Sequence, residues 1–447
     1  MYKIYIETLG CPKNRVDSER FLANFNGSLT SHPRLADLII VNTCAFIDDA
    51  TEESIQRILE LARLKVHHPE IKILVFGCLV NRYGREKLSE LIPEVDGFLP
   101  VIDDQKPEDT ALFQSFKDAS SSCKDLNFPS LTPAYYRYLK LSEGCNNHCS
   151  YCLIPSIRGN LRSRDLEDIG RQIGIWSQDL RLREIILIAQ DTTRYGDDLA
   201  VPLRLVHLLR LIEESPFQGW VRLLYTNPGY FTAELIDFLA SSRKVVPYLD
   251  MPIQHSHREV LKRMNRRYDT NQLIDLYQQL RARIPSLILR TTVMVGFPYE
   301  TEKRFEHLLN FIQEYPFDKL GAFVFQPQEG TLAYHWRKHA VARHTKDHRL
   351  AELMGIQHEL ARERNQLWIG KSLRVLVEGR CNKKGYSWVG RSFMDAPDID
   401  GLTYIRSGNE LTPGEWVDVT IEKADSYDTF AAVNEGTLSM DGEENCR

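Results

Sequence analysis

The 447-residue sequence lacks several features that would assign it to a class at once. It has no run of about 18 apolar residues, so no membrane-spanning helix is expected. Its first residues, MYKIYIETLG, lack a basic segment followed by an apolar one, so no secretory signal is expected. It also lacks a basic excess, because 56 Lys and Arg face 61 Asp and Glu, which disfavours a general nucleic-acid binder. These absences predict a cytoplasmic protein that does not bind a membrane.

Cysteine is present in an odd number, nine, which disfavours a disulfide framework in a large cytosolic chain and favours metal binding. Three of the nine, Cys145, Cys149 and Cys152, fall within EGCNNHCSYC. A zinc site usually takes four ligands in two pairs, and no further pair follows at zinc-like spacing, although His148 is a candidate fourth ligand. Three thiolates instead suit a [4Fe–4S] cluster that keeps one iron open for another ligand.

The first third of the chain repeats a buried-strand pattern three times, each followed by a helical pattern. The three strand patterns cover residues 2–8, 38–42 and 71–76, and they end at Cys11, Cys44 and Cys78. Apolar strands that alternate with helices predict a parallel α/β sheet, whose ligand crevice lies at the carboxyl ends of the strands. We therefore expect these cysteines to share one edge of the sheet. The alternative is three small buried residues that happen to end strands.

Six further strand patterns, separated for the most part by helical patterns, predict a partial (β/α)6 barrel with the first cysteine trio at its carboxyl end. They cover residues 136–141, 184–188, 220–224, 248–251, 289–295 and 319–325. A helical pattern over 344–368 and then short strands broken by Gly, Pro and Asp predict a small all-β domain. A polar stretch over 105–132 predicts a linker. The expected domains are 1–130, 131–366 and 367–437, with a polar tail at 438–447.

The Cys-x3-Cys-x2-Cys spacing, with Tyr151 before the last cysteine, resembles the radical S-adenosylmethionine (SAM) enzymes. That resemblance implies that the open iron holds the amino and carboxylate groups of SAM, whose reductive cleavage yields a radical that removes hydrogen from a C–H bond. LGCPKNRVDSE, VNTCAFIDDATEES and FGCL are similar to the N-terminal, flavodoxin-like domain of the methylthiotransferases. This similarity implies a second [4Fe–4S] cluster on Cys11, Cys44 and Cys78. The C-terminal β domain resembles the TRAM domain, which recognises substrate in that family.

The resemblance also implies which other residues and partners take part. SAM contacts are expected from Tyr151, Gln190, Gly296 and Phe297. An ordinary turn at Gly296, structural hydrogen bonding at Gln190 and shielding of the cluster by Tyr151 remain open alternatives. An electron donor such as flavodoxin or ferredoxin is expected, and the chain is expected to be a monomer.

Two branches of the family differ in substrate. One modifies the β-carbon of an aspartate in ribosomal protein S-twelve, and the other modifies an adenosine beside the tRNA anticodon. Pro12-Lys13-Asn14 and LIPSIRG favour the ribosomal-protein branch. Residues 371–428 contain eight Lys or Arg and ten Asp or Glu, a balance that suits a basic protein better than phosphates. The tRNA-modifying enzyme remains the alternative, and a noncatalytic iron–sulfur or zinc module that docks on the ribosome is the rival from another class.

Overall fold

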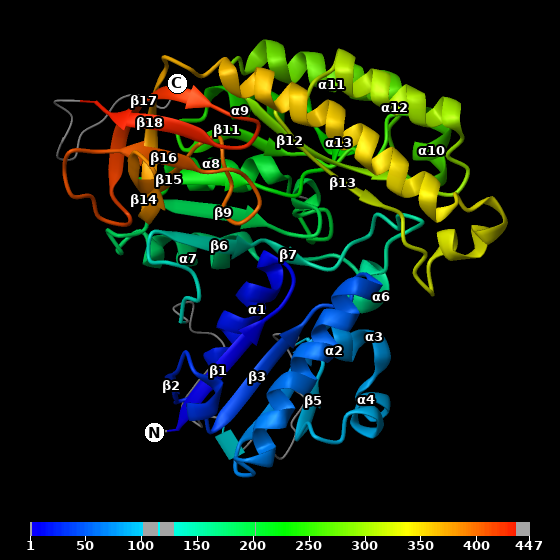
Figure 1. Cartoon of the computed structure of the whole chain (residues 1–447), viewed down its shortest axis with the longest axis vertical. Coiled ribbons are helices and arrows are strands. Elements are labelled where there is room, and N and C mark those ends of the chain that lie inside the picture. The colour runs from blue at the N-terminus through cyan, green and yellow to red at the C-terminus, as the bar shows by residue number, and fades with distance from the viewer. Residues whose placement is uncertain (1, 102–114, 117–128, 202, 435–447) are drawn as a thin grey trace.

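A computed structural model describes residues 2–101, 115–116, 129–201 and 203–434 of the chain. Most of the predicted linker over 105–132, the predicted tail, Cys123 and Cys446 lie outside the described residues. Figure 1 shows an N-terminal α/β domain below a larger body, which is made of a curved sheet with its helices and a small β-barrel. No helix among the described residues is long and apolar enough to span a bilayer.

The N-terminal domain is a five-stranded parallel sheet with strand order β2-β1-β3-β4-β5. Helix α1 covers one face, and α2, α3 and α4 cover the other, so the sheet has two separate apolar cores. Strand β3 is buried along its whole length, as expected for a central parallel strand. This strand order is that of flavodoxin-like folds, as predicted. The elements are β1 (Lys3–Thr8), α1 (Pro12–Leu22), β2 (Ser28–Leu29), β3 (Leu38–Thr43), α2 (Asp48–Ala62), β4 (Lys72–Gly77), α3 (Cys78–Tyr83), α4 (Arg85–Leu91) and β5 (Gly97–Leu99).

The central domain is built on six parallel strands in the order β13-β12-β11-β10-β9-β6, which leaves β6 and β13 as the two edges. The predicted partial barrel is therefore confirmed. Its strands are β6 (Tyr136–Lys140), β9 (Glu184–Ile188), β10 (Trp220–Leu223), β11 (Val245–Asp250), β12 (Ile288–Val295) and β13 (Lys319–Val324). Its helices are α7 (Leu166–Trp176), α8 (Leu205–Glu214), α9 (Ala233–Ser241), α10 (Arg258–Arg263), α11 (Thr270–Arg283), α12 (Glu302–Glu314) and α13 (Arg343–Gln366). A short ladder of β7 (Ser142–Glu143) and β8 (Arg162–Ser163) frames helix α6 (Ile154–Arg158).

The C-terminal domain is a closed β-barrel with strand order β14-β15-β16-β18-β17. It packs on the inner face of the curved sheet. Along β9, Ile185 and Leu187 point to the outer helices, whereas Ile186 and Ile188 join a core shared with the small barrel, as the two-residue period of a strand requires. The strands are β14 (Ser372–Lys383), β15 (Tyr386–Ser392), β16 (Thr403–Arg406), β17 (Trp416–Ala424) and β18 (Thr429–Val433). The small barrel thus closes one end of the partial barrel and leaves the other end free for a site.

A buried ion network fixes this docking. Glu184 accepts a hydrogen bond from Arg222 at 2.6 Å and pairs with Arg391 of the small barrel at 2.8 Å. Each of the three side chains is at most 1% exposed. The two guanidinium groups hold the pKa of Glu184 below its usual value in spite of burial, which opposes ionisation.

Candidate active site

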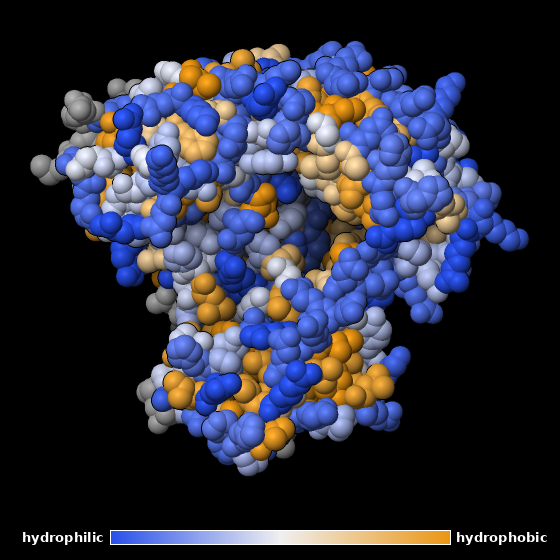
Figure 2. All heavy atoms as spheres, viewed as in Figure 1, coloured by the Kyte–Doolittle hydropathy of each residue, from blue (hydrophilic) through white to orange (hydrophobic). Residues whose placement is uncertain are grey.

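All six predicted cluster cysteines line one cavity of about 340 Å³. The hollow in Figure 2 lies where the N-terminal domain meets the partial barrel. Cys11, Cys44 and Cys78 follow the carboxyl ends of β1, β3 and β4, and they form the wall on the N-terminal side. The other three come from the loop between β7 and α6, at the carboxyl end of β6. The structure therefore brings together two cysteine trios whose members lie between 67 (Cys78 to Cys145) and 141 residues (Cys11 to Cys152) apart in the sequence.

The backbone of the first trio is tightly packed. Gly10 has φ +86°, and a Cβ atom there would lie 2.7 Å from the Cβ of Cys44, so only glycine allows the two loops to approach. Ser54 of helix α2 donates to the carbonyl of Cys44 at 2.7 Å and accepts from its amide at 3.1 Å. These contacts set the positions of Cys11 and Cys44 before any cluster binds.

The second trio lies on a loop held by its own hydrogen bonds and by the barrel. The amide of Cys145 donates to the carbonyl of Gly159 at 3.2 Å, and that of Cys152 donates to the carbonyl of Cys149 at 3.0 Å. His148, the candidate fourth zinc ligand, is exposed, has φ +50° and does not line the cavity. Within the described ranges, no three His, Cys, Asp or Glu side chains converge closely enough to bind a single metal ion. This arrangement suits a cluster, which spreads its ligands over several irons, better than it suits zinc.

Burial raises the pKa of the thiols of Cys44, Cys78, Cys145 and Cys152. The pKa of Cys78 and that of Cys145 are each about 11, and that of Cys152 is about 12. Without a metal they are therefore protonated at neutral pH, which disfavours a role as thiolate nucleophiles. Cluster binding must displace these protons, so we expect it to be favoured by alkaline pH.

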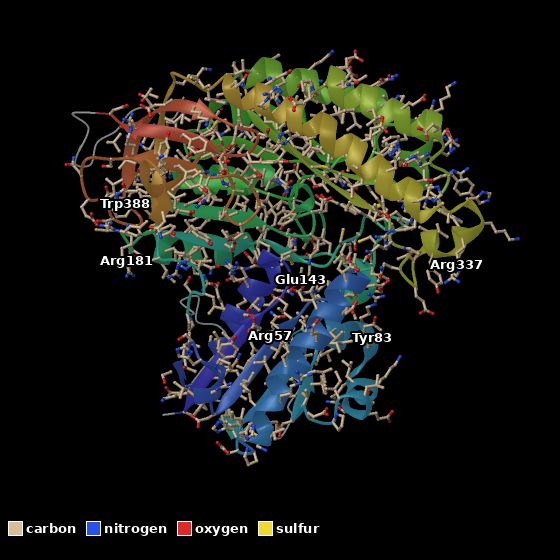
Figure 3. The ribbon with its side chains drawn as sticks, in the orientation of Figure 1. Arg57, Tyr83, Glu143, Arg181, Arg337 and Trp388 are labelled. Carbon is tan, nitrogen blue, oxygen red and sulfur yellow. The ribbon has the colours of Figure 1, made fainter. Side chains whose placement is uncertain are left out.

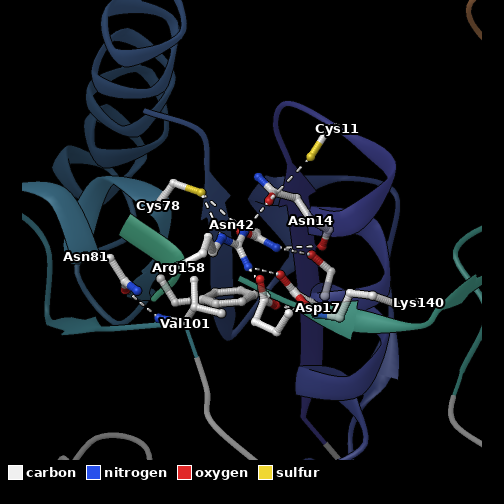
Figure 4. A network of polar contacts seen from close by, with 12 residues as sticks. Cys11, Asn14, Asp17, Asn42, Cys78, Asn81, Val101, Lys140 and Arg158 are labelled. Atoms are coloured by element: carbon white, nitrogen blue, oxygen red, sulfur yellow. Dashed lines mark hydrogen bonds and ion pairs between the residues drawn. The ribbon is translucent and has the colours of Figure 1, made fainter. Parts of the chain in front are cut away.

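Arg158 joins the two walls of the cavity (Figure 4). Its side chain is 2% exposed, and it donates to Asp17 at 2.6 Å, to Asn14 at 2.6 Å and to Glu143 at 3.3 Å. Two further contacts, at 3.3 and 3.2 Å, reach the Sγ atom of Cys78. Hydrogen bonds to a ligand sulfur orient it and tune the cluster that it holds.

Lys140 completes this network. It pairs with Asp17 and, at 2.8 Å, with Glu143, which Figure 3 places at the junction of the N-terminal domain and the barrel. The two cations hold the pKa of Glu143 well below its usual range, although burial acts in the opposite direction. Two carboxylates and two cations thus balance each other across the domain boundary.

The whole chain and each of its domains are similar to known proteins. Residues 139–312 match the Radical SAM superfamily, residues 3–100 the uncharacterized protein family UPF0004, and residues 369–433 the TRAM domain. A protein of Desulfitobacterium hafniense named ribosomal protein uS12 methylthiotransferase RimO is 40% identical over 442 residues, which cover 96% of this chain and 98% of the relative. A protein of the same name from Caldanaerobacter subterraneus is 42% identical over 96% of this chain and 99% of its own length.

The chain belongs to the RimO family of radical SAM methylthiotransferases. Family membership implies SAM and [4Fe–4S] cluster chemistry. The fold agrees with a solved radical SAM methyltransferase, TsrM of Kitasatospora setae, which was determined with cobalamin and a [4Fe–4S] cluster bound. That likeness has a TM-score of 0.52 at 13% identity and covers 72% of this chain and 74% of that one, so it bears on the fold alone.

The cavity offers polar groups that fit a RimO-family cofactor. The Oε1 atoms of Gln190 and Gln254 are buried, and neither has a hydrogen-bond partner among the described residues. Both side chains line the cavity, as does Tyr151. Buried amide oxygens without partners are costly, and a ligand with amino or hydroxyl donors, such as SAM, would satisfy them. The residues present therefore fit the cofactor that the family uses.

The other two predicted SAM contacts, Gly296 and Phe297, lie outside the lining of this cavity. Phe297 is fully buried, and its ring meets the ring of Tyr151 edge to face at a centroid distance of 6.3 Å. Gly296 has φ +73°, its amide donates to Glu300 at 2.8 Å, and a Cβ there would lie 2.3 Å from Lys346. Neither residue lines the cavity of the six cysteines. Direct contact of Gly296 and Phe297 with SAM thus stays a prediction.

Two polar residues near the cavity, Asp191 and His255, have partners within the protein. Asp191 accepts hydrogen bonds from Asn147 at 2.6 Å and Asn227 at 3.0 Å. His255 is fully buried and accepts from the amide of His257 at 2.9 Å, with Glu300 at 3.4 Å from its other ring nitrogen.

Sequence reasoning missed Arg266, which donates to the carbonyl of Pro252 at 3.1 Å and lies 3.7 Å from the Sγ of Cys149. It also assigned no binding role to Lys13 or Tyr225, which line the cavity. The marker Pro12-Lys13-Asn14 was a signal for Lys13, whereas nothing in the residue spacing pointed to Arg266 or Tyr225.

Proposed function

We propose that this chain attaches a methylthio group to the β-carbon of an aspartate in ribosomal protein uS12. The observation that carries the proposal is the identity of 40–42% over nearly the full length with proteins named uS12 methylthiotransferase. The cavity shared by six cysteines supports it, because methylthiolation needs a hydrogen-removing centre and a sulfur-donating centre near one substrate carbon. Such a reaction belongs where ribosomes are assembled, in the cytoplasm.

The proposal gives each cysteine trio one role. Cys145, Cys149 and Cys152 hold the [4Fe–4S] cluster that binds SAM, and Cys11, Cys44 and Cys78 hold a second [4Fe–4S] cluster that carries the sulfur. When bound, SAM supplies both the methyl group and the radical that removes the substrate hydrogen. An electron donor such as flavodoxin or ferredoxin supplies the electron for the reductive cleavage of SAM. The chain works as a monomer.

The protein's own side chains orient and shield these groups. Gln190 donates to Glu143 at 2.9 Å, which turns its free Oε1 towards the cavity to accept a donor of SAM. Tyr151, supported from behind by Phe297, covers one side of the second trio and excludes water. Gly296 acts through the backbone that places Phe297. Arg158 orients Cys78 and fixes the two walls of the cavity relative to each other.

The tRNA-modifying alternative receives less support from charge. The small barrel carries about two more negative than positive charges over residues 371–428. A surface that docks on RNA phosphates gains from excess Lys and Arg, whereas a basic ribosomal protein is attracted by the opposite sign.

Mass spectrometry of uS12 and of tRNA nucleosides from cells with and without this chain tests the proposal. We expect uS12 from the deletion strain to lose the mass of one CH2S unit, because CH3–S– replaces a hydrogen, while tRNA methylthio-adenosines stay unchanged. A plasmid copy should restore the mass, and a Cys145→Ser copy should not. Loss of the tRNA modification with an unchanged uS12 would show that the substrate is wrong.

A further inference from the structure

Lys13 places a buried ammonium group in the cavity. It is the second residue of α1, two positions after Cys11, and only 9% of it is exposed. Its Nζ atom lies 3.5 Å from the ring centroid of Tyr225, which follows strand β10 of the barrel. A cation carried by the N-terminal domain therefore reaches the opposite wall, between the two cysteine trios.

This ammonium has no anionic partner within the described parts of the chain. The lining cation Arg158 pairs with two carboxylates, and Arg266 donates to a backbone carbonyl. Asp191 is the acidic side chain among the lining residues, and its oxygens already accept from Asn147, Asn227 and Thr193. A buried cation without an anion is costly, so the site is complete only when a bound molecule supplies one.

The wall beneath the ammonium is rigidly held. Tyr225 has φ +60°, which is rare for a bulky residue and persists only where neighbouring groups enforce it. Its amide donates to Asp250 at 3.1 Å, and its carbonyl accepts from the amide of Thr192 at 3.0 Å. The position of the aromatic ring, and so of the cation above it, is set before a ligand binds.

We propose that Lys13 binds the side-chain carboxylate of the substrate aspartate. This inference rests on the proposed function and names the group that recognises the substrate. The carboxylate is bonded directly to the β-carbon, so an ammonium that holds it fixes the reacting carbon one bond away. An adenosine offers no carboxylate, so the same contact selects a protein substrate over tRNA.

SAM also carries a carboxylate, and the second cluster is a further possible anion, so the experiment separates the three. We would reconstitute wild type, Lys13→Met and Lys13→Arg anaerobically and measure kcat/KM on uS12 with aspartate or asparagine at the target position. Iron content and SAM cleavage without uS12 report on the other two anions. Lys87→Met is the matched control, since this exposed lysine also lies over a tyrosine ring, that of Tyr83 at 5.7 Å.

We expect the effects of replacing Lys13 and of replacing the target aspartate by asparagine to be coupled. Asparagine in uS12 should lower kcat/KM of the wild type on the order of 100-fold, the scale of a broken buried charge pair. Lys13→Met should lower it to a similar extent on aspartate but make asparagine no worse. Lys13→Arg should retain part of the activity, and Lys87→Met should match the wild type. Iron content and SAM cleavage without uS12 should be unchanged in every variant.

Three results would overturn the inference. The first is an asparagine penalty in Lys13→Met equal to that in the wild type. The second is a loss of SAM cleavage without uS12, which would assign Lys13 to SAM. The third is a loss of iron, which would assign it to the cluster. A wild type that leaves aspartate uS12 unmodified would instead contradict the proposed function, and the role of Lys13 with it.

Discussion

Replacing Arg158 with methionine should remove the main electrostatic link between the N-terminal domain and the barrel. The network holds two cations, Arg158 and Lys140, and two carboxylates, Asp17 and Glu143. Asp17 is 7% exposed and Glu143 is 16% exposed. The substitution therefore leaves one buried negative charge unpaired. Breaking a buried pair in this way typically costs about 3–5 kcal/mol.

Urea unfolding of the cluster-free chain at pH 7, followed by circular dichroism, measures this cost. We expect Arg158→Met to lower the free energy of unfolding by about 3–5 kcal/mol. Adding Asp17→Asn removes the stranded charge, so the double variant should recover about 1–3 kcal/mol of it through coupling. Arg181→Met is the control, because this side chain is 75% exposed and pairs with Asp179 on the surface, where solvent screening should leave the free energy of unfolding close to that of the wild type.

The reasoning would be refuted if Arg158→Met cost no more than Arg181→Met. It would also be refuted if the effects of Arg158→Met and Asp17→Asn simply added, since side chains of one network must be coupled.

Four further substitutions test other parts of the structure. Cys78→Ser and Cys145→Ser should each lower the iron content from about eight to about four per reconstituted chain, and retention of about eight in either would exclude that cysteine as a required ligand. Burial raises the pKa of Glu19 from 4.5 to about 7, so its contribution to stability is complete below pH 4.5 and is lost as the pH rises to 7. Glu19→Gln should therefore be more stable than wild type at pH 8 by roughly 3 kcal/mol in urea unfolding, and parallel pH profiles would contradict this. Gly296→Ala forces a Cβ against Lys346 at positive φ, so its melting temperature should drop as about 1–3 kcal/mol of strain enters, whereas an unchanged one would show that this backbone relaxes freely.

Much of the fold could be predicted because the strands are short apolar runs separated by amphipathic helices. Strand β9 matches its predicted range, and the other barrel strands differ from theirs by up to three residues at an end. In the partial barrel, consecutive parallel strands joined by helices lie side by side, as they usually do.

Helix α2 shows where periodicity alone falls short. Ile55, Ile58, Leu59 and Ala62 fall at helical spacing in the sequence, yet Leu59 is 39% exposed and Ser54 is fully buried. Ser54 is buried because its hydroxyl hydrogen-bonds with the backbone of Cys44, so a polar residue lies on the buried face of the helix. Hydrophobic patterns do not encode such a contact.

How the three domains dock on one another could not be predicted from the sequence either. Arg158 lies within LIPSIRG, but its contacts with Asp17 and Cys78 depend on how two domains meet. Glu184 and Arg391 are also far apart in the chain, and they become a buried pair only because the small barrel packs on the curved sheet. The residues of a long-range ion network have no characteristic spacing in the sequence. The clustered cysteines of a metal-binding loop do have one.

The most direct test of the central claim uses anaerobically reconstituted enzyme, SAM and uS12 whose aspartates carry deuterium at the β-carbon. The account predicts that CH3–S– replaces one β-deuterium of the target aspartate in uS12 and that this deuterium appears in 5′-deoxyadenosine. Transfer of the methylthio group to tRNA adenosine instead, or a modified uS12 without deuterium in 5′-deoxyadenosine, would contradict it.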